Sequence, residues 1–241
     1  MTVSSDEPLF GVVWRALATE HASLAIAAPL ARRYPADVVP FAALLEYRED
    51  ALAQLRELML PGEETYVGWS EIAGVEFPAC QGIEVLFDIN ALQMVPSQSS
   101  ATVAVEDKAA PPVIMPLNAE NAAEMVELTD VAFPGFFRPR TYVMGSYWGI
   151  RAEGKLVAMA GERLAVPGMR EISAVCTRPG HTGRGYAAHL IRHLLHEHAA
   201  AGLESFLHVA ETNHRAIALY ERLGFVMVGA TRCTRIRRSA T

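Results

Sequence analysis

Cysteine is scarce in this 241-residue sequence, and basic residues do not outnumber acidic ones. The cysteines are Cys80, Cys176 and Cys233, an odd number of residues that lie far apart and form no C-x-x-C pair. This spacing argues against a zinc knuckle or a redox dithiol and predicts reduced, mostly structural thiols. Lys and Arg number 21 against 27 Asp and Glu, a net charge of −6. Nucleic acid is therefore not an expected partner.

Long apolar runs are also lacking. No stretch approaches the roughly 20 apolar residues that span a bilayer, and the first residues lack the basic and apolar regions of a secretion signal. We therefore expect a cytoplasmic protein with no membrane partner. Hydrophobic residues make up 51% of the chain and charged residues 20%, a composition typical of a folded protein. At about 100–200 residues per domain, the chain has room for one or two domains.

A change in composition divides the sequence into two parts. Small, polar and Pro-bounded residues between Val95 and Pro112 carry no sustained apolar period. We interpret residues 97–111 as a linker between an N-terminal α/β half, residues 1–96, and a second domain, residues 112–241. The first half shows helical spacing over 11–28 and 49–60, and no motif that indicates chemistry.

The second part alternates between strand and helix patterns. Helical spacing is found at 119–132, 183–201 and 213–223, and a last strand is predicted at 225–232. Strands separated by helices predict an α/β, or layered α+β, domain with the helices packed on a central sheet.

The segment from Thr177 to Ala187 joins a predicted strand directly to an amphipathic helix. Gly183 and Gly185 remove side chains where backbone N–H groups would face a ligand, and a helix N-terminus carries partial positive charge. This pattern is typical of a turn that binds an anion such as a pyrophosphate. A P-loop pattern and a complete G-x-G-x-x-G are absent. A plain strand-to-helix turn is the alternative interpretation.

Three histidines follow in the same predicted helix, His189, His193 and His196. Their spacing could bind zinc, but no carboxylate or cysteine joins them on that face. A solvated helix face is the favoured interpretation, and we expect no metal.

Together with Glu211 to Phe225, the turn resembles the GCN5-related N-acetyltransferases (GNAT), specifically their FR47-like branch. The resemblance covers roughly residues 113–241. It implies a mixed central sheet with splayed strands flanked by helices, and acetyl-CoA as cosubstrate. The family's pyrophosphate loop, [RQ]-x-x-G-x-[GA], maps onto Thr182, Gly183, Arg184, Gly185, Tyr186 and Ala187.

The position of Thr182 departs from this family pattern, because Arg or Gln is usual there. A side-chain contact to phosphate is then shortened or lost, while the backbone donors are kept. Arg184 or Arg178 could supply the charge instead.

The resemblance also implies roles for residues on the neighbouring elements. The strand Val175, Cys176 and Thr177 would splay from its neighbour and pair its backbone with pantetheine. The N–H near Val175 would polarise the thioester carbonyl. Tyr220 would protonate the departing thiolate, and Asn213 would bind pantetheine or order the start of the helix.

A general base for the acceptor amine is the remaining requirement. Strand alternation places Glu171 on the same face as Ser173, Val175 and Thr177, and histone-acetylating members of the family carry a general-base Glu there. Partial burial is expected to raise its pKa toward neutrality. The structural alternative is a salt-bridged Glu171, with Arg170 as its candidate partner. Glu162 and water are the substitute bases.

For the other reactive or charged residues, a structural role is the favoured interpretation. Cys176 could be a nucleophile, but no His is placed beside it by the sequence, and direct transfer needs no covalent step. The arginines near the C-terminus could meet an acidic acceptor or the CoA 3′-phosphate, although a solvated tail is favoured; these are Arg232, Arg235, Arg237 and Arg238.

The leading functional hypothesis is an acetyl-CoA-dependent N-acyltransferase that transfers acetyl directly to a primary amine of a small molecule or peptide in a ternary complex. The alternatives are a non-catalytic acyl-CoA-binding or sensing module and a transferase of a longer acyl group. Net negative charge mildly favours a cationic acceptor. By analogy with glycine N-acyltransferase-like enzymes, residues 1–96 could be a degenerate copy of the same fold that shapes the acceptor site. A homodimer is the default oligomer in this family.

Overall fold

The computed structural model describes residues 9–69, 76–97, 111–132 and 135–240. The linker predicted over 97–111 lies almost entirely outside these residues. The helices are α1 Val12–Ala18, α2 Glu49–Leu58, α3 Ala122–Ala132, α4 Tyr186–Ala200 and α5 His214–Arg222, with short 3₁₀ turns η1 Ala22–Leu24, η3 Ala119–Asn121 and η4 Thr141–Met144. The strands are β1 Ile26–Ala27, β2 Ala31–Arg33, β3 Phe41–Leu44, β4 Glu64–Trp69, β5 Ile83–Pro96, β6 Ile114–Leu117, β7 Tyr147–Ala152, β8 Lys155–Val166, β9 Met169–Thr177, β10 Glu204–Ala210 and β11 Phe225–Arg238.

All the described strands belong to a single sheet in the order β1-β2-β3-β4-β11-β5-β10-β9-β8-β7-β6. The pairs β10–β9 and β3–β4 are parallel, and the other described pairs are antiparallel. The sheet is therefore mixed, with helices on both of its faces, and the predicted α/β class is confirmed.

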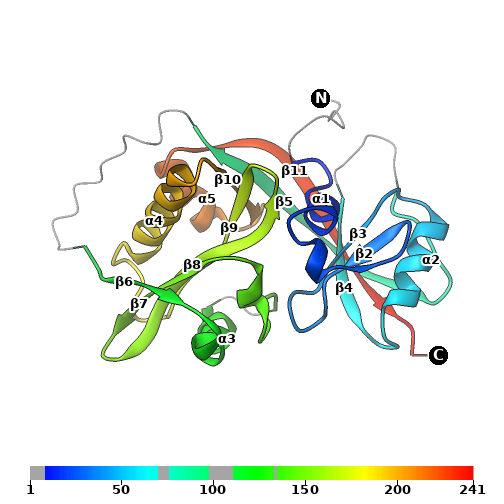
Figure 1. Cartoon of the computed structure of the whole chain (residues 1–241), viewed down its shortest axis with the longest axis horizontal. Helices are drawn as coiled ribbons and strands as arrows, with labels where there is room; N and C mark the ends of the chain where they lie inside the picture. The colour runs from blue at the N-terminus through cyan, green and yellow to red at the C-terminus, as the bar shows by residue number, and fades with distance from the viewer. Residues whose placement is uncertain (1–8, 70–75, 98–110, 133–134, 241) are drawn as a thin grey trace.

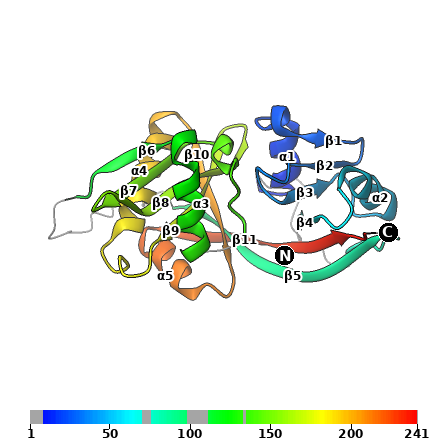
Figure 2. The ribbon, with the colours of Figure 1, turned by 90° about the horizontal axis from the view of Figure 1, so that it is seen from below.

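Two 14-residue strands, β5 and β11, hold the two parts of the chain together. They pair along almost their whole length, from Phe225 opposite Pro96 to Arg238 opposite Ile83. In addition, β5 pairs with β10 on its other side, and the far end of β11 pairs with β4. Figures 1 and 2 show both strands running from one lobe of the molecule into the other. The two parts expected from the sequence thus share one continuous sheet.

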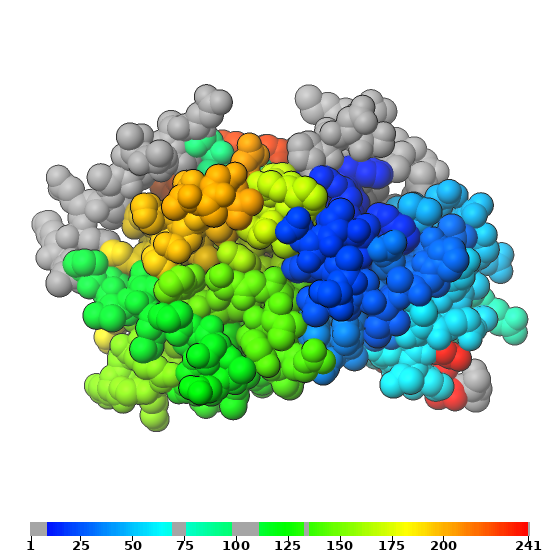
Figure 3. Space-filling view, in the orientation of Figure 1, coloured from blue at the N-terminus to red at the C-terminus, as the bar shows by residue number. Residues whose placement is uncertain are grey.

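Four apolar clusters form the core. One lies between α4, α5 and the sheet and includes Leu190, Leu194, Leu207 and Tyr220. A second lies on the opposite face under α3, a third lies under α2, and the last fills the junction between the two lobes. Figure 3 shows the N-terminal residues packed directly against the C-terminal lobe at this junction.

The helix predicted over 11–28 is shorter in the structure, where α1 ends at Ala18. The chain turns there so that the His21 side chain enters the junction. His21 Nδ1 lies 2.8 Å from the Tyr34 hydroxyl, and Nε2 lies 3.0 Å from the Met144 carbonyl oxygen. This tertiary contact overrides the local helical pattern.

The arginines near the C-terminus form no solvated tail. The last strand continues six residues beyond the predicted end, because Thr234 to Arg237 pair with both β5 and β4 and Arg238 pairs with β5. Arg235 and Arg237 both bind Glu64 of β4. Their charges are therefore paired with a carboxylate of the neighbouring strand. No helix among the described residues is long and apolar enough to cross a membrane.

Candidate active site

The predicted anion-binding turn connects β9 to α4. Gly183 and Gly185 have φ angles of +79° and +74°, a conformation that side chains rarely adopt, and Gly185 is the N-cap of α4. The first bond into the helix runs from the His189 N–H to the Gly185 carbonyl, at 3.1 Å. The N–H groups of Tyr186, Ala187 and Ala188 have no backbone partner among the described residues. These donors and the two glycines fit a pyrophosphate.

Arg184 and Arg178 are the two arginines at this turn. Arg178, the other candidate, is held by Glu127, with 2.9 Å between Nη2 and Oε1. Thr182 and Arg184 are both exposed. Within the described part of the chain, Arg184 makes no ion pair and can turn toward a bound phosphate.

Next to the turn, β9 and β10 separate. Their parallel pairing covers Glu204 to Phe206 and ends where Phe206 lies opposite Glu171. Beyond this point β9 continues along β8 as far as Thr177, whereas β10 continues along β5 as far as Ala210. A wedge with two unpaired strand edges opens between them, and the splaying predicted for Val175 to Thr177 is confirmed.

A β-bulge interrupts β9 at the wedge. Ala174 has a φ of +52°, and the register on β8 shifts between the pairs Met159–Cys176 and Gly161–Ser173. Val175 consequently packs with Ile172 in the cluster under α4 and α5, while Cys176 packs under α3. The predicted alternation, which placed Glu171 and Val175 on one face, is wrong because the bulge adds a residue between them.

Glu171 lies at the closed end of the wedge and is fully buried. Its carboxylate accepts bonds from Arg163 through Nε, at 2.9 Å, and through Nη2, and from the Leu164 N–H at 3.2 Å. His208 Nδ1 lies 2.8 Å from Oε1. Burial alone would raise the pKa of Glu171, but Arg163 and His208 together lower it to about 2.

The expectation of a Glu171 pKa near neutrality is therefore wrong. The ion-paired alternative describes this residue, although its partner is Arg163; Arg170 instead binds Glu20 at 3.1 Å. Glu162 does not supply a near-neutral base either. Burial opposes its ionisation, but bonds from His198, at 3.1 Å, and the Ser146 N–H lower its pKa.

Comparison with known proteins identifies the family to which this chain belongs. Residues 147–235 match the model of the FR47-like protein family. A solved GNAT-family protein from Novosphingobium aromaticivorans DSM 12444 has a TM-score of 0.82 and 34% identity, over 97% of this chain and 100% of that one. The chain belongs to the GNAT family.

Two further proteins extend the comparison. The N-alpha-acetyltransferase RimI of Mycobacterium tuberculosis (strain ATCC 25618 / H37Rv) is 38% identical over 89 residues, 36% of this chain; the match spans 55% of that relative's length. A GCN5-related N-acetyltransferase from Kribbella flavida has a TM-score of 0.59 at 15% identity, over 95% of this chain and 96% of that one. At that identity the likeness concerns the fold alone, and it includes the N-terminal lobe.

Tyr220 lies in helix α5, and Asn213 is the N-cap of that helix. Tyr220 is buried beside Phe225, with ring centroids 5.8 Å apart, and burial raises the pKa of its hydroxyl to about 12. The phenol therefore keeps its proton at neutral pH. The Asn213 side chain accepts a bond from the Ala216 N–H at 3.2 Å, so it caps α5.

Cys176 fits a structural role. It is buried, and burial raises the pKa of its thiol to about 12. A thiol that holds its proton is a poor nucleophile.

Sequence reasoning missed three polar residues of the site: Arg163, His208 and Gln93. Gln93 Nε2 lies 3.1 Å from His208 Nε2 and donates to the Leu9 carbonyl at 3.2 Å. These contacts form a series, Gln93–His208–Glu171–Arg163, that joins β5, β10, β9 and β8. The charged pair Glu162–Arg163 within the apolar strand pattern 155–166 is the signal that could have indicated it.

Proposed function

We propose that the protein is an acetyl-CoA-dependent N-acetyltransferase that transfers acetyl directly to a primary amine in a ternary complex. The observation that supports this proposal is the continuity between the α4 turn and the β9–β10 wedge. The turn offers unpaired N–H groups and two left-handed glycines for the pyrophosphate. The wedge offers unpaired strand edges for the amides of the pantetheine arm.

Within this proposal, each residue at the wedge has a separate role in acetyl transfer. The backbone of Val175, Cys176 and Thr177 pairs with pantetheine, and the Val175 N–H stabilises the negative charge that develops on the thioester oxygen. Tyr220 donates its proton to the CoA thiolate as the C–S bond breaks. Asn213 holds the first turn of α5 in place behind Tyr220.

The acceptor amine must lose a proton as the new C–N bond forms. With a pKa of about 2, Glu171 is too weak a base to compete for it near pH 7. We therefore assign this proton to water. Glu171 contributes by fixing the positions of Arg163 and His208, both of which it binds.

The N-terminal lobe supplies one side of the acceptor site in this proposal. Its strand β4 pairs with β11, and its helix α1 packs in the junction beside Leu164 and Phe206 of the C-terminal lobe. A role as a degenerate GNAT-like copy that shapes this site fits that placement.

The test is calorimetric titration with acetyl-CoA and CoA, combined with thiol release over a panel of amines. The variant Gly185→Asp should weaken acetyl-CoA binding at least 100-fold, because it adds a side chain and a negative charge at the phosphate position.

Gly154→Asp is the matched control. Gly154 also has a positive φ, +78°, but lies in the β7–β8 turn, and we expect unchanged binding. Normal acetyl-CoA binding by Gly185→Asp would refute the assigned turn. Binding without thiol release from any amine would favour a sensing module, and release only from a longer acyl-CoA would favour the other alternative.

A further inference from the structure

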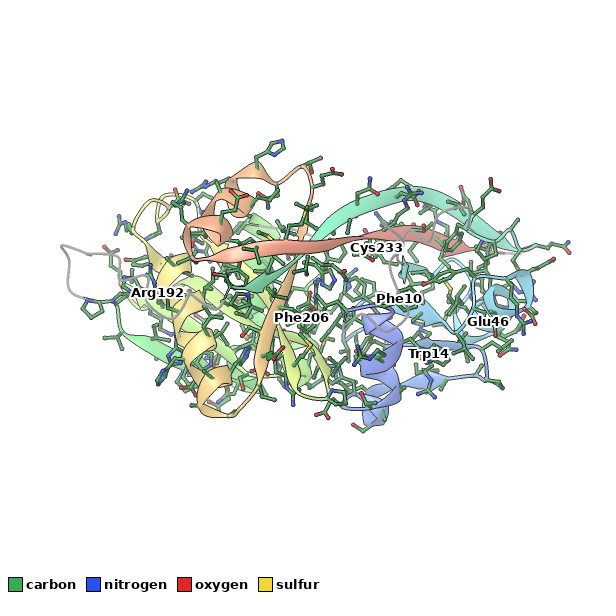
Figure 4. All side chains as sticks on the ribbon, turned by 90° about the horizontal axis from the view of Figure 1, so that it is seen from above. Phe10, Trp14, Glu46, Arg192, Phe206 and Cys233 are labelled. Carbon is green, nitrogen blue, oxygen red and sulfur yellow. The ribbon has the colours of Figure 1, made fainter. Side chains whose placement is uncertain are left out.

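A cavity of about 130 Å³ lies at the junction of the two lobes. Its floor is formed by neighbouring residues of three central strands, Ala210 of β10, Ala91 of β5 and Thr231 of β11. Val12 and Val13 of α1 belong to the opposite wall. Figure 4 shows Cys233, another lining residue, in the middle of β11 close to α1.

The cavity exists because its floor carries small side chains. Ala91 and Ala210 face each other in register, and Gly68 of β4 has Val13 Cγ2 only 3.5 Å from the position of an added Cβ. Larger residues there would fill the space that α1 leaves above the sheet. The lining is mostly apolar, and its charged or ionisable members are Arg163, His208 and the thiol of Cys233.

The cavity and the wedge meet at β10. His208 and Ala210 line the cavity, and both lie beyond Phe206, where β10 has separated from β9. Their neighbours Leu207 and Val209 pack on the other face, under α4 and α5. A thioester held on the α4 side and a molecule in the cavity would therefore meet at the wedge from opposite faces of the sheet.

Arg163 sets the charge that a molecule in the cavity would meet. Its side chain is 17% exposed, whereas the carboxylate side chain of Glu171 is 0% exposed behind it. Nε and Nη2 are used by Glu171, and the guanidinium lies over the Phe41 ring at 5.0 Å. Within the described part of the chain, Nη1 donates to no residue, so it is available to an anionic oxygen.

The volume limits the apolar part of the occupant. A protein cavity of about 150 Å³ holds one benzene molecule. A cavity of about 130 Å³ therefore suits a branched aliphatic side chain better than an indole.

We infer that this cavity is the acceptor site, and that the acceptor is a small α-amino acid with an apolar side chain. Its carboxylate binds Arg163 Nη1, its side chain fills the cavity, and its neutral amine faces the wedge. This inference rests on the proposed function. It also reverses the expectation from net charge, because the charged group that the cavity exposes is a cation, which would repel a polyamine.

The experiment compares matched acceptors by thiol release from acetyl-CoA. L-leucine carries all three features, 3-methylbutylamine lacks only the carboxylate, glycine lacks the side chain, and spermidine adds cations. We expect kcat/KM for L-leucine to exceed that for 3-methylbutylamine by about 10–100-fold, the usual worth of a hydrogen bond between charged groups. Glycine and spermidine should also be poor acceptors.

Two variants locate the effect. Arg163→Lys keeps the charge but loses Nη1, and should raise KM for L-leucine about tenfold while reducing its advantage over 3-methylbutylamine. Val13→Phe should fill the cavity and lower kcat/KM for L-leucine at least tenfold, with acetyl-CoA binding unchanged. Arg140→Lys, in an exposed pair with Asp37, is the control and should behave as wild type.

Direct titration of L-leucine in the presence of CoA completes the test and separates the two proposals. Equal use of 3-methylbutylamine and L-leucine, or no effect of Val13→Phe, would overturn the acceptor assignment and leave the transferase intact. Absence of acetyl-CoA binding and thiol release would count against the transferase. In that case, failure of L-leucine to bind would overturn the acceptor site as well.

Discussion

Glu171 is held by three groups from two neighbouring strands, β8 and β10. Arg163 comes from β8 and His208 from β10, and the Leu164 N–H completes the set. A buried carboxylate is tolerable only when it is paired and hydrogen-bonded, and this one satisfies both conditions. The same pairing leaves it poorly suited to accept a proton.

The Glu171 pKa predicts how stability depends on pH. The folded value of about 2 lies below the ordinary value of 4.5, so the unfolded chain binds the proton more readily. The stabilising contribution is therefore complete above pH 4.5 and is lost as the pH falls toward 2. Glu171→Gln should flatten this part of the profile. It should also lower the free energy of unfolding at pH 7 by about 3–5 kcal/mol, because the largely buried charge of Arg163 would lose its partner.

Urea denaturation at pH 7, 4.5 and 3 measures both effects. Glu124→Gln is the control, because Glu124 pairs with Arg151 at the surface, where an ion pair contributes little. An unchanged acid slope in Glu171→Gln would show that Glu171 does not carry this pH dependence.

Tyr220 leads to a kinetic prediction. Because its hydroxyl keeps its proton at neutral pH, Tyr220→Phe should lower kcat by about 10–1000-fold. Acetyl-CoA binding, followed by calorimetry, should change little. Tyr142→Phe, outside the wedge, serves as the matched control. Unchanged kcat in Tyr220→Phe would remove this residue from the mechanism.

At the scale of elements, residues with a positive φ mark two places beside the wedge, the turn before α4 and strand β9. Gly183 and Gly185 could be predicted to need unusual conformations, because glycine before a helix signals this directly. The bulge at Ala174 carries no such signal, since alanine rarely adopts a positive φ. One additional residue in β9 then moved Val175 off the face that it was predicted to share with Glu171. Simple alternation fails at a bulge for that reason.

The helices also differ in how well the local sequence pattern predicts their bounds. The bounds predicted for α2 and α5 agree with the structure to within two residues, since each has an amphipathic pattern and a clear end signal. Helix α1 ends ten residues early because His21 is drawn into the junction by Tyr34 and Met144. A contact 123 residues away in sequence is invisible to a local pattern.

For the whole molecule, the shared strands β5 and β11 predict that the two lobes unfold together. Trp14 lies in the N-terminal lobe under Arg32, and Trp148 lies in the C-terminal lobe against His193. Variants that retain only Trp14 or only Trp148 should report the same urea midpoint by fluorescence, as for a cooperative two-state unit. Two separate midpoints would show that the lobes are independent domains.

The sequence alone was sufficient to predict the α/β class, the glycine turn before α4, the splayed β9 strand and the GNAT relationship. Each depends on neighbouring residues, or on a family motif that is contiguous in the chain. The tertiary structure decided the Arg163–Glu171–His208 cluster, the bulge, the insertion of β5 between β10 and β11, and the cavity between the lobes. These features arise from contacts between residues far apart in the chain, and such contacts form only when several strands pair at once.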